Sequence, residues 1–278
     1  MPSGLCGKII LFFLCFCVSV AISQATKAQS DSAFSFLKTI KGNYASFTVD
    51  NLDNVYLITT TNQLKKINGN GDSVGVFNDV KRYGNVTAID VTNPLKILLY
   101  YKNFATVVVL DRFLNTRNTI NLRKLNIFSV QSITTSYDNN IWLFDEQDYK
   151  LKKIDDDGRL LLETTDFRML FDSVPLPLNL IDKDNFVYLY DTVKGFYIFD
   201  YYGAFKNRLS FLNWNNVAVS AKNMYGFSNN KLYSYQLNSL TLKEYKLPSY
   251  FGYYYTIKAT NGKLYLLKDD GIYIYQVK

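Results

Sequence analysis

The chain repeats one short sequence unit six times, and this repeat limits its possible folds more than any other feature. Each copy has a turn rich in Asp and Asn, then an apolar strand with an aromatic residue or Leu at its second place. A polar break and a second apolar strand follow. The copies recur about every 40 residues, and a period of this length made only of strands predicts a β-propeller. They begin at Asp50, Thr92, Ser136, Asp182, Ala221 and Thr260.

Two further strand-like segments flank the copies, which gives each unit four strands. A short apolar segment precedes every copy, and we expect these segments to line a central channel. A more polar, amphipathic segment follows five of the copies and should form the outer edge of its blade. The inner segments begin at Ser46, Val86, Val130, Leu178, Val217 and Tyr255, and the outer ones at Asp72, Arg117, Arg159, Phe205 and Leu242.

The sixth unit has no outer strand of its own, because the chain ends at Lys278 soon after the third strand. The amphipathic segment Ala33–Ile40 stands at the other end without an inner partner. We predict that it pairs with Ile272–Gln276 and closes the ring, since closure removes open strand edges. The predicted fold is all-β, a single six-bladed propeller over residues 24–278 with four antiparallel strands per blade. One helical turn is expected within Thr164–Val174.

The N-terminal segment is predicted to be a signal peptide of residues 1–23. Lys8 precedes the apolar run Ile9–Ile22, and small residues follow. Cleavage is expected after Ser23 or, alternatively, after Ala28. The run is shorter than the about 20 residues of a membrane span, although an uncleaved anchor is the alternative. We therefore expect a periplasmic or outer-membrane-associated protein with no membrane span after cleavage.

The mature chain has few residues suited to catalysis. Its sequence contains no histidine, and Cys6, Cys15 and Cys17 all lie in the predicted signal. It cannot build a thiolate nucleophile, a histidine-based triad or a His/Cys zinc site. No run of Lys and Arg resembles a nucleic-acid-binding stripe. We predict a non-enzyme without a cofactor and without a nucleic-acid partner, and a carboxylate-dependent hydrolase is one alternative.

Acidic turns are the candidate metal sites, because calcium binds clustered carboxylate and carbonyl oxygens. Asp, Asn and Gly are also the residues that tight turns require, and the turns recur wherever a blade needs a hairpin. We interpret them as turns and predict no metal site. These turns are Asp50–Asp53, Asp138–Asn140, Asp155–Gly158 and Asp182–Asn185.

The segments that connect one blade to the next are long and carry large side chains. In a propeller they lie on one face together with the turns between second and third strands. Aromatic and Arg side chains contribute much of the binding energy at protein interfaces, so we predict a partner-binding face here. The alternative is a glycan or small-ligand site, and some of the aromatic residues should fill gaps between blades. The predicted face residues are Arg82, Tyr83, Arg123, Lys124, Phe128, Phe167, Arg168, Phe171, Trp214, Tyr250, Tyr253 and Tyr254.

Four Asp-Ser/Thr-apolar triplets resemble the O-glycosylation acceptor of some Gram-negative envelope proteins. Their candidate acceptors are Ser32, Ser73, Ser173 and Thr192.

The repeat resembles that of six-bladed TolB-like and NHL-like propellers. The resemblance rests on DNLDNVYL, from Asp50 to Leu57, and on its shortened form DNFVYL, from Asp184 to Leu189. It covers the whole mature chain. Envelope propellers that resemble TolB or BamB act as protein-binding scaffolds in outer-membrane machinery. The resemblance therefore implies an envelope protein partner, within an outer-membrane assembly or secretion complex.

Overall fold

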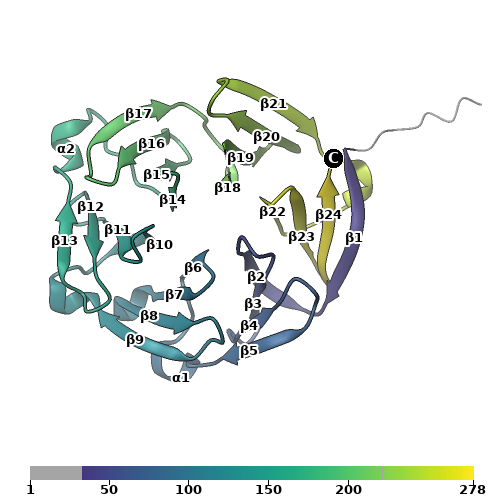
Figure 1. The fold of residues 1–278 in the computed structure, drawn as a ribbon, viewed down its shortest axis with the longest axis horizontal. Coiled ribbons are helices and arrows are strands. Elements are labelled where there is room, and N and C mark those ends of the chain that lie inside the picture. The colour runs from purple at the N-terminus through teal and green to yellow at the C-terminus, as the bar shows by residue number, and fades with distance from the viewer. Residues whose placement is uncertain (1–32, 221) are drawn as a thin grey trace, which may run out of the picture. The chain divides into compact units, whose positions relative to one another are not determined.

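The computed structural model describes residues 33–220 and 222–278. These residues form six four-stranded antiparallel sheets in a ring (Figure 1), which confirms the all-β class and the six-bladed propeller. The predicted signal peptide and the candidate acceptor Ser32 lie outside the described residues.

In blades 1 to 5 the strands lie side by side in chain order, from the central channel outward. The predicted inner, middle and outer strands are all present. Blade 1 comprises β2 (Tyr44–Val49), β3 (Val55–Thr59), β4 (Leu64–Ile67) and β5 (Ser73–Phe77). Blade 2 comprises β6 (Ala88–Asn93), β7 (Lys96–Tyr101), β8 (Thr106–Asp111) and β9 (Thr116–Asn121). Blade 3 comprises β10 (Val130–Thr135), β11 (Ile141–Asp145), β12 (Lys150–Ile154) and β13 (Leu160–Glu163).

The last three blades follow the same plan, except that the outer strand of blade 6 comes from the start of the chain. Blade 4 comprises β14 (Asn179–Lys183), β15 (Phe186–Asp191), β16 (Gly195–Asp200) and β17 (Phe205–Leu209). Blade 5 comprises β18 (Asn215–Ser220), β19 (Asn223–Ser228), β20 (Lys231–Gln236) and β21 (Thr241–Lys246). Blade 6 comprises β22 (Thr256–Thr260), β23 (Lys263–Lys268), β24 (Gly271–Val277) and β1 (Phe34–Lys41).

Helical structure in the described residues is confined to short turns in the connections. The helical turn expected within Thr164–Val174 is confirmed as α2 (Phe167–Leu170), where the Asp166 carboxylate accepts the N–H of Arg168 at 2.8 Å. The others are α1 (Val80–Tyr83), η1 (Lys102–Phe104), η2 (Leu122–Leu125) and η3 (Ser249–Phe251). None of the helices in these residues is long and apolar enough to cross a membrane.

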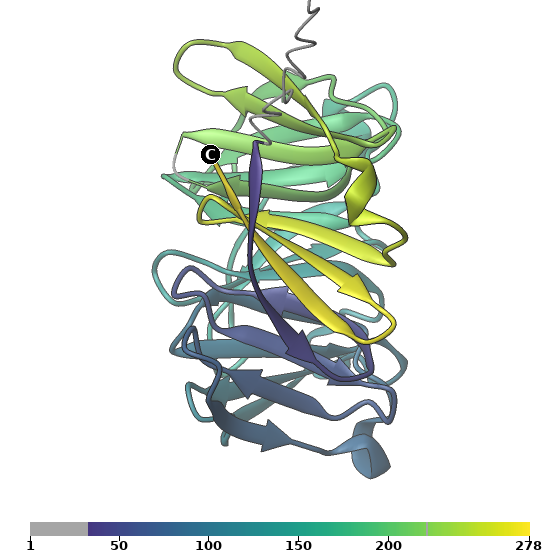
Figure 2. The same ribbon diagram turned by 90° about the vertical axis from the view of Figure 1, so that its right-hand side faces the viewer.

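The predicted closure of the ring is confirmed. Strand β1 pairs antiparallel with β24 from Phe34 opposite Val277 to Lys41 opposite Gly271. Figure 2 shows β1 running alongside the strands of the last blade. Both ends of the propeller therefore lie in one sheet, and the hydrogen bonds of that sheet hold the ring shut.

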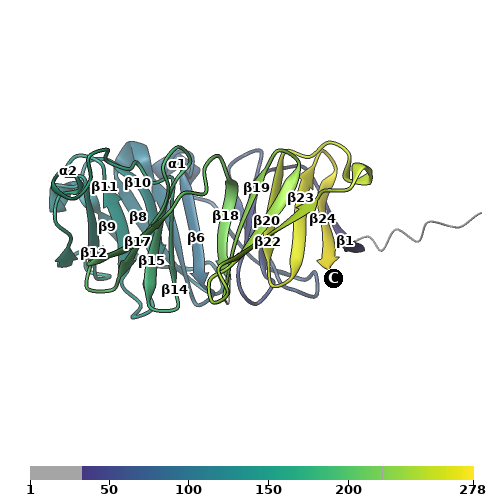
Figure 3. The same cartoon turned by 90° about the horizontal axis from the view of Figure 1, so that it is seen from above.

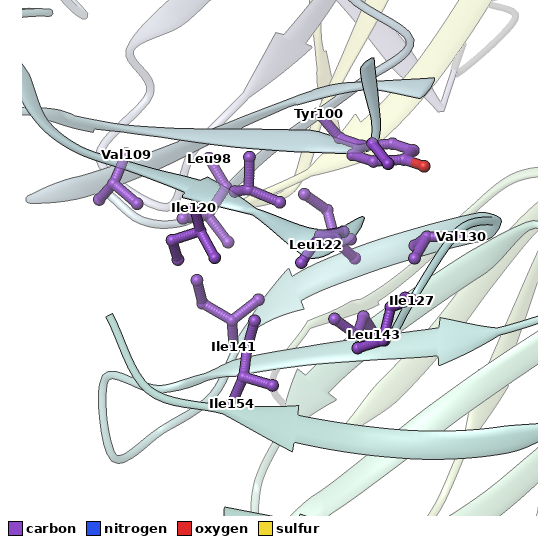
Figure 4. Close-up of a cluster of buried hydrophobic side chains, with 13 residues drawn as sticks. Leu98, Tyr100, Val109, Ile120, Leu122, Ile127, Val130, Ile141, Leu143 and Ile154 are labelled. Atoms are coloured by element: carbon purple, nitrogen blue, oxygen red, sulfur yellow. The ribbon is translucent and has the colours of Figure 1, made fainter. Parts of the chain in front are cut away.

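Each seam between neighbouring blades contains one apolar cluster, and six such clusters follow one another around the ring. The middle strands face a neighbouring blade on both sides, so most of their side chains are buried; all six residues of β7 are buried. Figure 4 shows the seam between blades 2 and 3, where Leu98 and Val109 lie opposite Ile141 and Ile154. Packing between blades, in addition to the hydrogen bonds within them, holds the ring together.

The order of the strands divides the connections between two faces. We call the face that carries the inter-blade connections and the turns between second and third strands the loop face. Figure 3 shows α1 and α2 at the same edge of the ring, with the end of β24 at the opposite edge. That opposite edge, which carries the remaining turns, is the turn face. The predicted face residues thus lie at one end of the propeller.

The closure predicts a strong effect of a side chain at Gly271, whose φ is 151°. A Cβ there would lie 2.2 Å from the carbonyl oxygen of Ile40 in β1. We expect Gly271→Ala to lower the free energy of unfolding by about 2 kcal/mol more than Gly71→Ala. Gly71 is the matched control, because its φ of 106° is also positive and nothing lies within 4 Å of its added Cβ. Urea unfolding measures the stability of both variants. Equal losses of unfolding free energy would show that the closing strand tolerates displacement.

Candidate functional site

Several of the predicted face residues pack inside the seams instead of facing solvent. Tyr83, Phe167 and Trp214 are buried in three different clusters, and Phe171 and Tyr254 are half-buried beside them. The expectation that some of these aromatic residues fill gaps between blades is met at these positions.

Trp214 shows how tightly such a residue is held. Its ring is stacked between Phe211, at a centroid distance of 4.5 Å, and Tyr233, at 5.4 Å. Gly226 lies beneath it, and a Cβ there would approach the indole to 2.3 Å. The Tyr190 hydroxyl accepts its backbone N–H at 2.6 Å. Because both faces of the indole are covered, only its edge is open to a ligand.

These buried residues belong to a regular pattern that the sequence analysis missed. Each of the long inter-blade connections inserts large apolar side chains into the seam that it spans. In four of the five connections the inserted residue lies in a short helical turn. A large apolar residue within such a turn is therefore the sequence pattern that could have predicted its burial. The inserted residues are Tyr83, Leu122 with Ile127, Phe167, Trp214 and Phe251.

The remaining predicted face residues are exposed. Phe128, Tyr250 and Tyr253 are aromatic, and Tyr253 is 71% exposed. Arg82, Arg123, Lys124 and Arg168 are basic and also exposed. Arg168 forms an ion pair with Asp166, and hydrogen bonding to that carboxylate raises the pKa of the guanidinium. Arg123 donates to the backbone oxygen of Asn103 at 2.9 Å.

Exposed apolar residues that were not predicted extend this surface across blades 4 to 6. They lie in α2, in the connections between blades 3 and 4, 4 and 5, and 5 and 6, and in the turn between β15 and β16. Together with Tyr253 we call them the apolar arc. The arc consists of Met169, Leu170, Leu176, Leu178, Val193, Leu212, Tyr253 and Tyr255.

Basic residues gather on the other half of the loop face. They come from α1, η1 and η2, and we call them the basic sector. The sector consists of Lys81, Arg82, Lys102, Arg123 and Lys124, all exposed. One half of the loop face therefore carries the apolar arc, with Arg168 beside Met169, and the other half carries the basic sector, with the exposed rings of Phe104 and Phe128. We call them the apolar half and the basic half.

A pocket of about 480 Å³ opens within the apolar half, between blades 4, 5 and 6. The edge of Trp214 and the rings of Tyr254 and Tyr255 form part of its wall. Within the described residues, no hydrogen bond engages the side-chain amides that line it. These amides belong to Asn179, Asn215, Asn216, Asn229 and Asn230. The one lysine in its wall, Lys231, pairs with Glu244 at 2.6 Å, so the pocket suits a neutral ligand rich in hydroxyl groups.

On the turn face, Asp50 and Asp155 accept backbone N–H groups, whereas Asp53 pairs with Lys263 and Asp138 with Lys153. Asp155 accepts the N–H groups of Asp157 at 3.0 Å and Arg159 at 2.8 Å. Asp50 accepts those of Leu52 and Asn54, each at 2.9 Å. These are turn-capping contacts. No group of three or more His, Cys, Asp or Glu residues in the described part of the chain is placed to hold a metal ion.

Two carboxylates beside the channel tie neighbouring blades together. Asp90 of blade 2 accepts the hydroxyls of Thr134 at 3.0 Å and Thr135 at 2.8 Å from blade 3, and its burial raises its pKa. Asp182 of blade 4 accepts the Trp142 indole N–H at 3.2 Å, also from blade 3. Burial raises the pKa of Asp182 to about 6. Both carboxylates are thus engaged by donors of blade 3, their shared neighbour.

The described glycosylation candidates differ in accessibility. Ser73 and Ser173 are exposed, whereas Thr192 is half-buried. The Asp191 carboxylate beside Thr192 accepts the N–H groups of Val193 and Lys194 in the same turn. Glycosylation stays a prediction, and Ser73 and Ser173 are its more accessible acceptors.

No protein-family model matches the sequence, and no curated protein matches it. Solved structures do match the fold. The chain is a six-bladed β-propeller. The Pan2 WD40 domain of Neurospora crassa is 9% identical with a TM-score of 0.60, over 88% of this chain and 95% of that one. Virginiamycin B lyase of Staphylococcus aureus is 14% identical with a TM-score of 0.58, over 88% and 89%.

A streptogramin B lyase is similar to the same degree, at 15% identity and a TM-score of 0.57, over 84% of this chain and 78% of that one. At these identities the likeness shows the propeller fold alone. Propellers host many unrelated activities, so neither binding nor catalysis follows from the comparison.

The division between buried and exposed residues predicts opposite outcomes for two aromatic positions. Trp214→Ala should lower the free energy of unfolding by about 3–5 kcal/mol, because it removes a residue packed on both faces. Tyr253→Ala should change it by about 0.5 kcal/mol or less, since its ring is mostly solvated. Chemical denaturation of both variants measures the difference. A large loss at Tyr253, or none at Trp214, would contradict the assignment of these two side chains.

Proposed function

We propose that this propeller is a non-enzymatic scaffold or accessory subunit that binds a protein partner through its loop face. The observation that carries the proposal is the apolar arc. Its members are exposed on consecutive connections, and Met169 is 80% exposed. Large contiguous apolar surfaces on soluble proteins commonly mark interaction sites, and Tyr is among the residues that dominate binding energy.

The two halves of the loop face indicate which partner surface would be complementary. We expect an apolar ridge that packs on the apolar arc and carboxylates beside it that pair with the basic sector. In the sector, Lys102 pairs with Glu146 at 3.5 Å, whereas Arg82 lies over the ring of Tyr83 at 4.9 Å. The excess of positive charge on this side would orient an acidic partner as it approaches.

The inserted residues make this face rigid. Phe167 lies two residues before Met169, and Phe251 lies two residues before Tyr253. Both Phe rings are buried, so Met169 and Tyr253 each follow an anchored residue. A face held in this way loses little conformational entropy on binding.

We place the partner in the bacterial envelope, within an outer-membrane assembly or secretion complex. Support for this part of the proposal comes from the sequence, through the predicted signal peptide and the resemblance to TolB-like propellers. The protein would be periplasmic or outer-membrane-associated.

The absence of histidine supports a role without catalysis. One of the similar structures is a histidine-to-alanine variant of virginiamycin B lyase that is described as catalytically inactive. The present sequence contains no histidine, so it cannot supply that side chain. Asp90 and Asp182, the buried carboxylates of its channel, are engaged in inter-blade hydrogen bonds.

Substitutions on the two faces test the proposal. Met169→Ser combined with Tyr253→Ser should lower partner recovery at least about tenfold, because the apolar contact is lost. The matched control is Leu240→Ser combined with Tyr202→Ser on the turn face, where these residues are 71% and 80% exposed. Mass spectrometry of the propeller purified from detergent-solubilised envelopes measures recovery. Equal loss in both variants, or a free monomer after gentle extraction of the wild type, would overturn the proposal.

A second candidate function, glycan binding, is favoured by the unengaged amides of the pocket. Asn amides offer a donor and an acceptor to adjacent sugar hydroxyls. In affinity electrophoresis, envelope polysaccharide in the gel should retard the wild-type protein. Asn179→Ala combined with Asn215→Ala should reduce this retardation. Asn43→Ala, which replaces another asparagine of the loop face, should leave it unchanged. Unretarded migration of the wild-type protein would exclude the second candidate and leave the first untouched.

A further inference from the structure

The repeat places six side chains at equivalent positions around the central channel. Each lies on an inner strand, directly opposite the aromatic residue or Leu that marks the second place of the repeat. We call them the channel layer. In blade order the layer consists of Thr48, Asp90, Thr134, Ile181, Ala218 and Lys258.

The channel is hollow at this layer. A cavity of about 280 Å³ runs along the inner strands, and every member of the layer except Thr134 lines it. Thr134 is fully buried. The layer thus offers one carboxylate, one ammonium group, a hydroxyl and two apolar side chains to a single cavity.

The two charged members of the layer have different surroundings. Asp90 is satisfied by hydroxyls, including that of Thr92 at 2.6 Å. For Lys258, no carboxylate of the described residues lies within ion-pair distance of the Nζ. Its one hydrogen bond goes to the Thr48 hydroxyl at 3.5 Å, the outer limit for such a contact, and the Phe47 ring centroid lies 5.9 Å away.

None of the carboxylates in the cavity wall, Asp50, Asp90 and Asp182, forms an ion pair with Lys258; each accepts hydrogen bonds from other groups. Asp50 accepts the Tyr56 hydroxyl at 3.0 Å together with turn N–H groups, and Asp182 is engaged by blade 3. Lys183, the remaining charged group in the wall, has the same sign as Lys258. Desolvation lowers the pKa of Lys258 to about 8, because its half-buried side chain has no carboxylate paired to it among the described residues.

We infer that the channel binds a small oxoanion, a carboxylate or a phosphate, with Lys258 as its charged anchor. The Nζ donates a charge-assisted hydrogen bond, the strongest kind available to a carboxylate or phosphate oxygen. The Thr48 hydroxyl stands beside it as a second donor. Ala218 and Ile181 form the apolar part of the wall, and Ala218 leaves space because its side chain is small.

The size of the cavity limits the ligand. Sites for drug-sized molecules usually span about 300–1,000 Å³, and this cavity lies just below that range, so it suits a small anion such as phosphate or succinate. The site lies among the inner strands and is separate from the apolar arc. A test can therefore contradict anion binding in the channel without contradicting partner binding on the loop face, and the reverse.

Ligand-dependent thermal unfolding tests the inference. Succinate or phosphate at pH 7 should raise the Tm of the wild-type protein in a concentration-dependent way, because a ligand bound to the folded state stabilises it. Lys183→Met, which removes a lysine from the same cavity, should respond like the wild type, and Lys258→Met should not respond. An equal response in Lys258→Met would overturn the inference. Comparison of the two anions shows which class of oxoanion the site prefers.

The pH dependence provides a second readout. Succinate keeps both charges between pH 7 and pH 9.5, whereas Lys258 loses its proton as the pH rises through about 8. Succinate binding to the wild-type protein should therefore weaken at least about fivefold over this range. Asp50, Asp90 and Asp182 also face the cavity, so Lys258→Arg is the control, because arginine stays charged. The same weakening in Lys258→Arg would assign the effect to the carboxylates and contradict the role of Lys258.

Amine labelling of the wild-type protein avoids any dependence on the folding of the variants. Phosphate or succinate should slow the acylation of Lys258 by an amine-reactive ester, relative to that of Lys183, when both are followed by peptide mass spectrometry. Unchanged labelling at saturating anion would overturn the inference.

Discussion

The antiparallel pairing of β1 with β24 is the contact on which the rest of the structure depends. It joins the first described strand to the last, so that blade 6 contains both ends of the ring. Most middle strands bury side chains on both faces and need a neighbouring blade on either side. An open ring would leave two blades with an uncovered face and β24 with an unpaired edge. The one closing sheet therefore allows all six seams to be filled.

The seams in turn determine what the loop face can display. Each long connection inserts at least one large side chain between two blades and leaves its neighbours in solvent, as Phe251 and Tyr253 do. The same segment stabilises the ring and presents a surface. This arrangement explains why aromatic residues are abundant in the connections although only part of them is available to a partner. It also holds the exposed residues in fixed positions relative to one another.

The strands, their phase and the closing pair could be predicted from the sequence because each depends on a local pattern that repeats. Six copies of one unit fix the position of every inner and outer strand, and the unpartnered segment near Ala33 supplies the missing strand. The fate of single aromatic residues could not be predicted in this way. Tyr83 and Arg82 are adjacent in the sequence, yet only Tyr83 enters a seam, because the helical turn α1 directs consecutive side chains to different sides.

The sequence alone determined the architecture of this protein, the absence of histidine chemistry and the face on which the long connections lie. Those properties follow from the composition and from the spacing at which the repeat unit recurs. Only the tertiary structure decided which side chains meet. The apolar arc and the amide-lined pocket combine residues from different blades. The channel cavity does so too, and in it no carboxylate of the described residues pairs with Lys258. Ring closure fixes the distances between the blades that contribute these residues. A pattern within one repeat carries no information about such contacts, because they form between repeats.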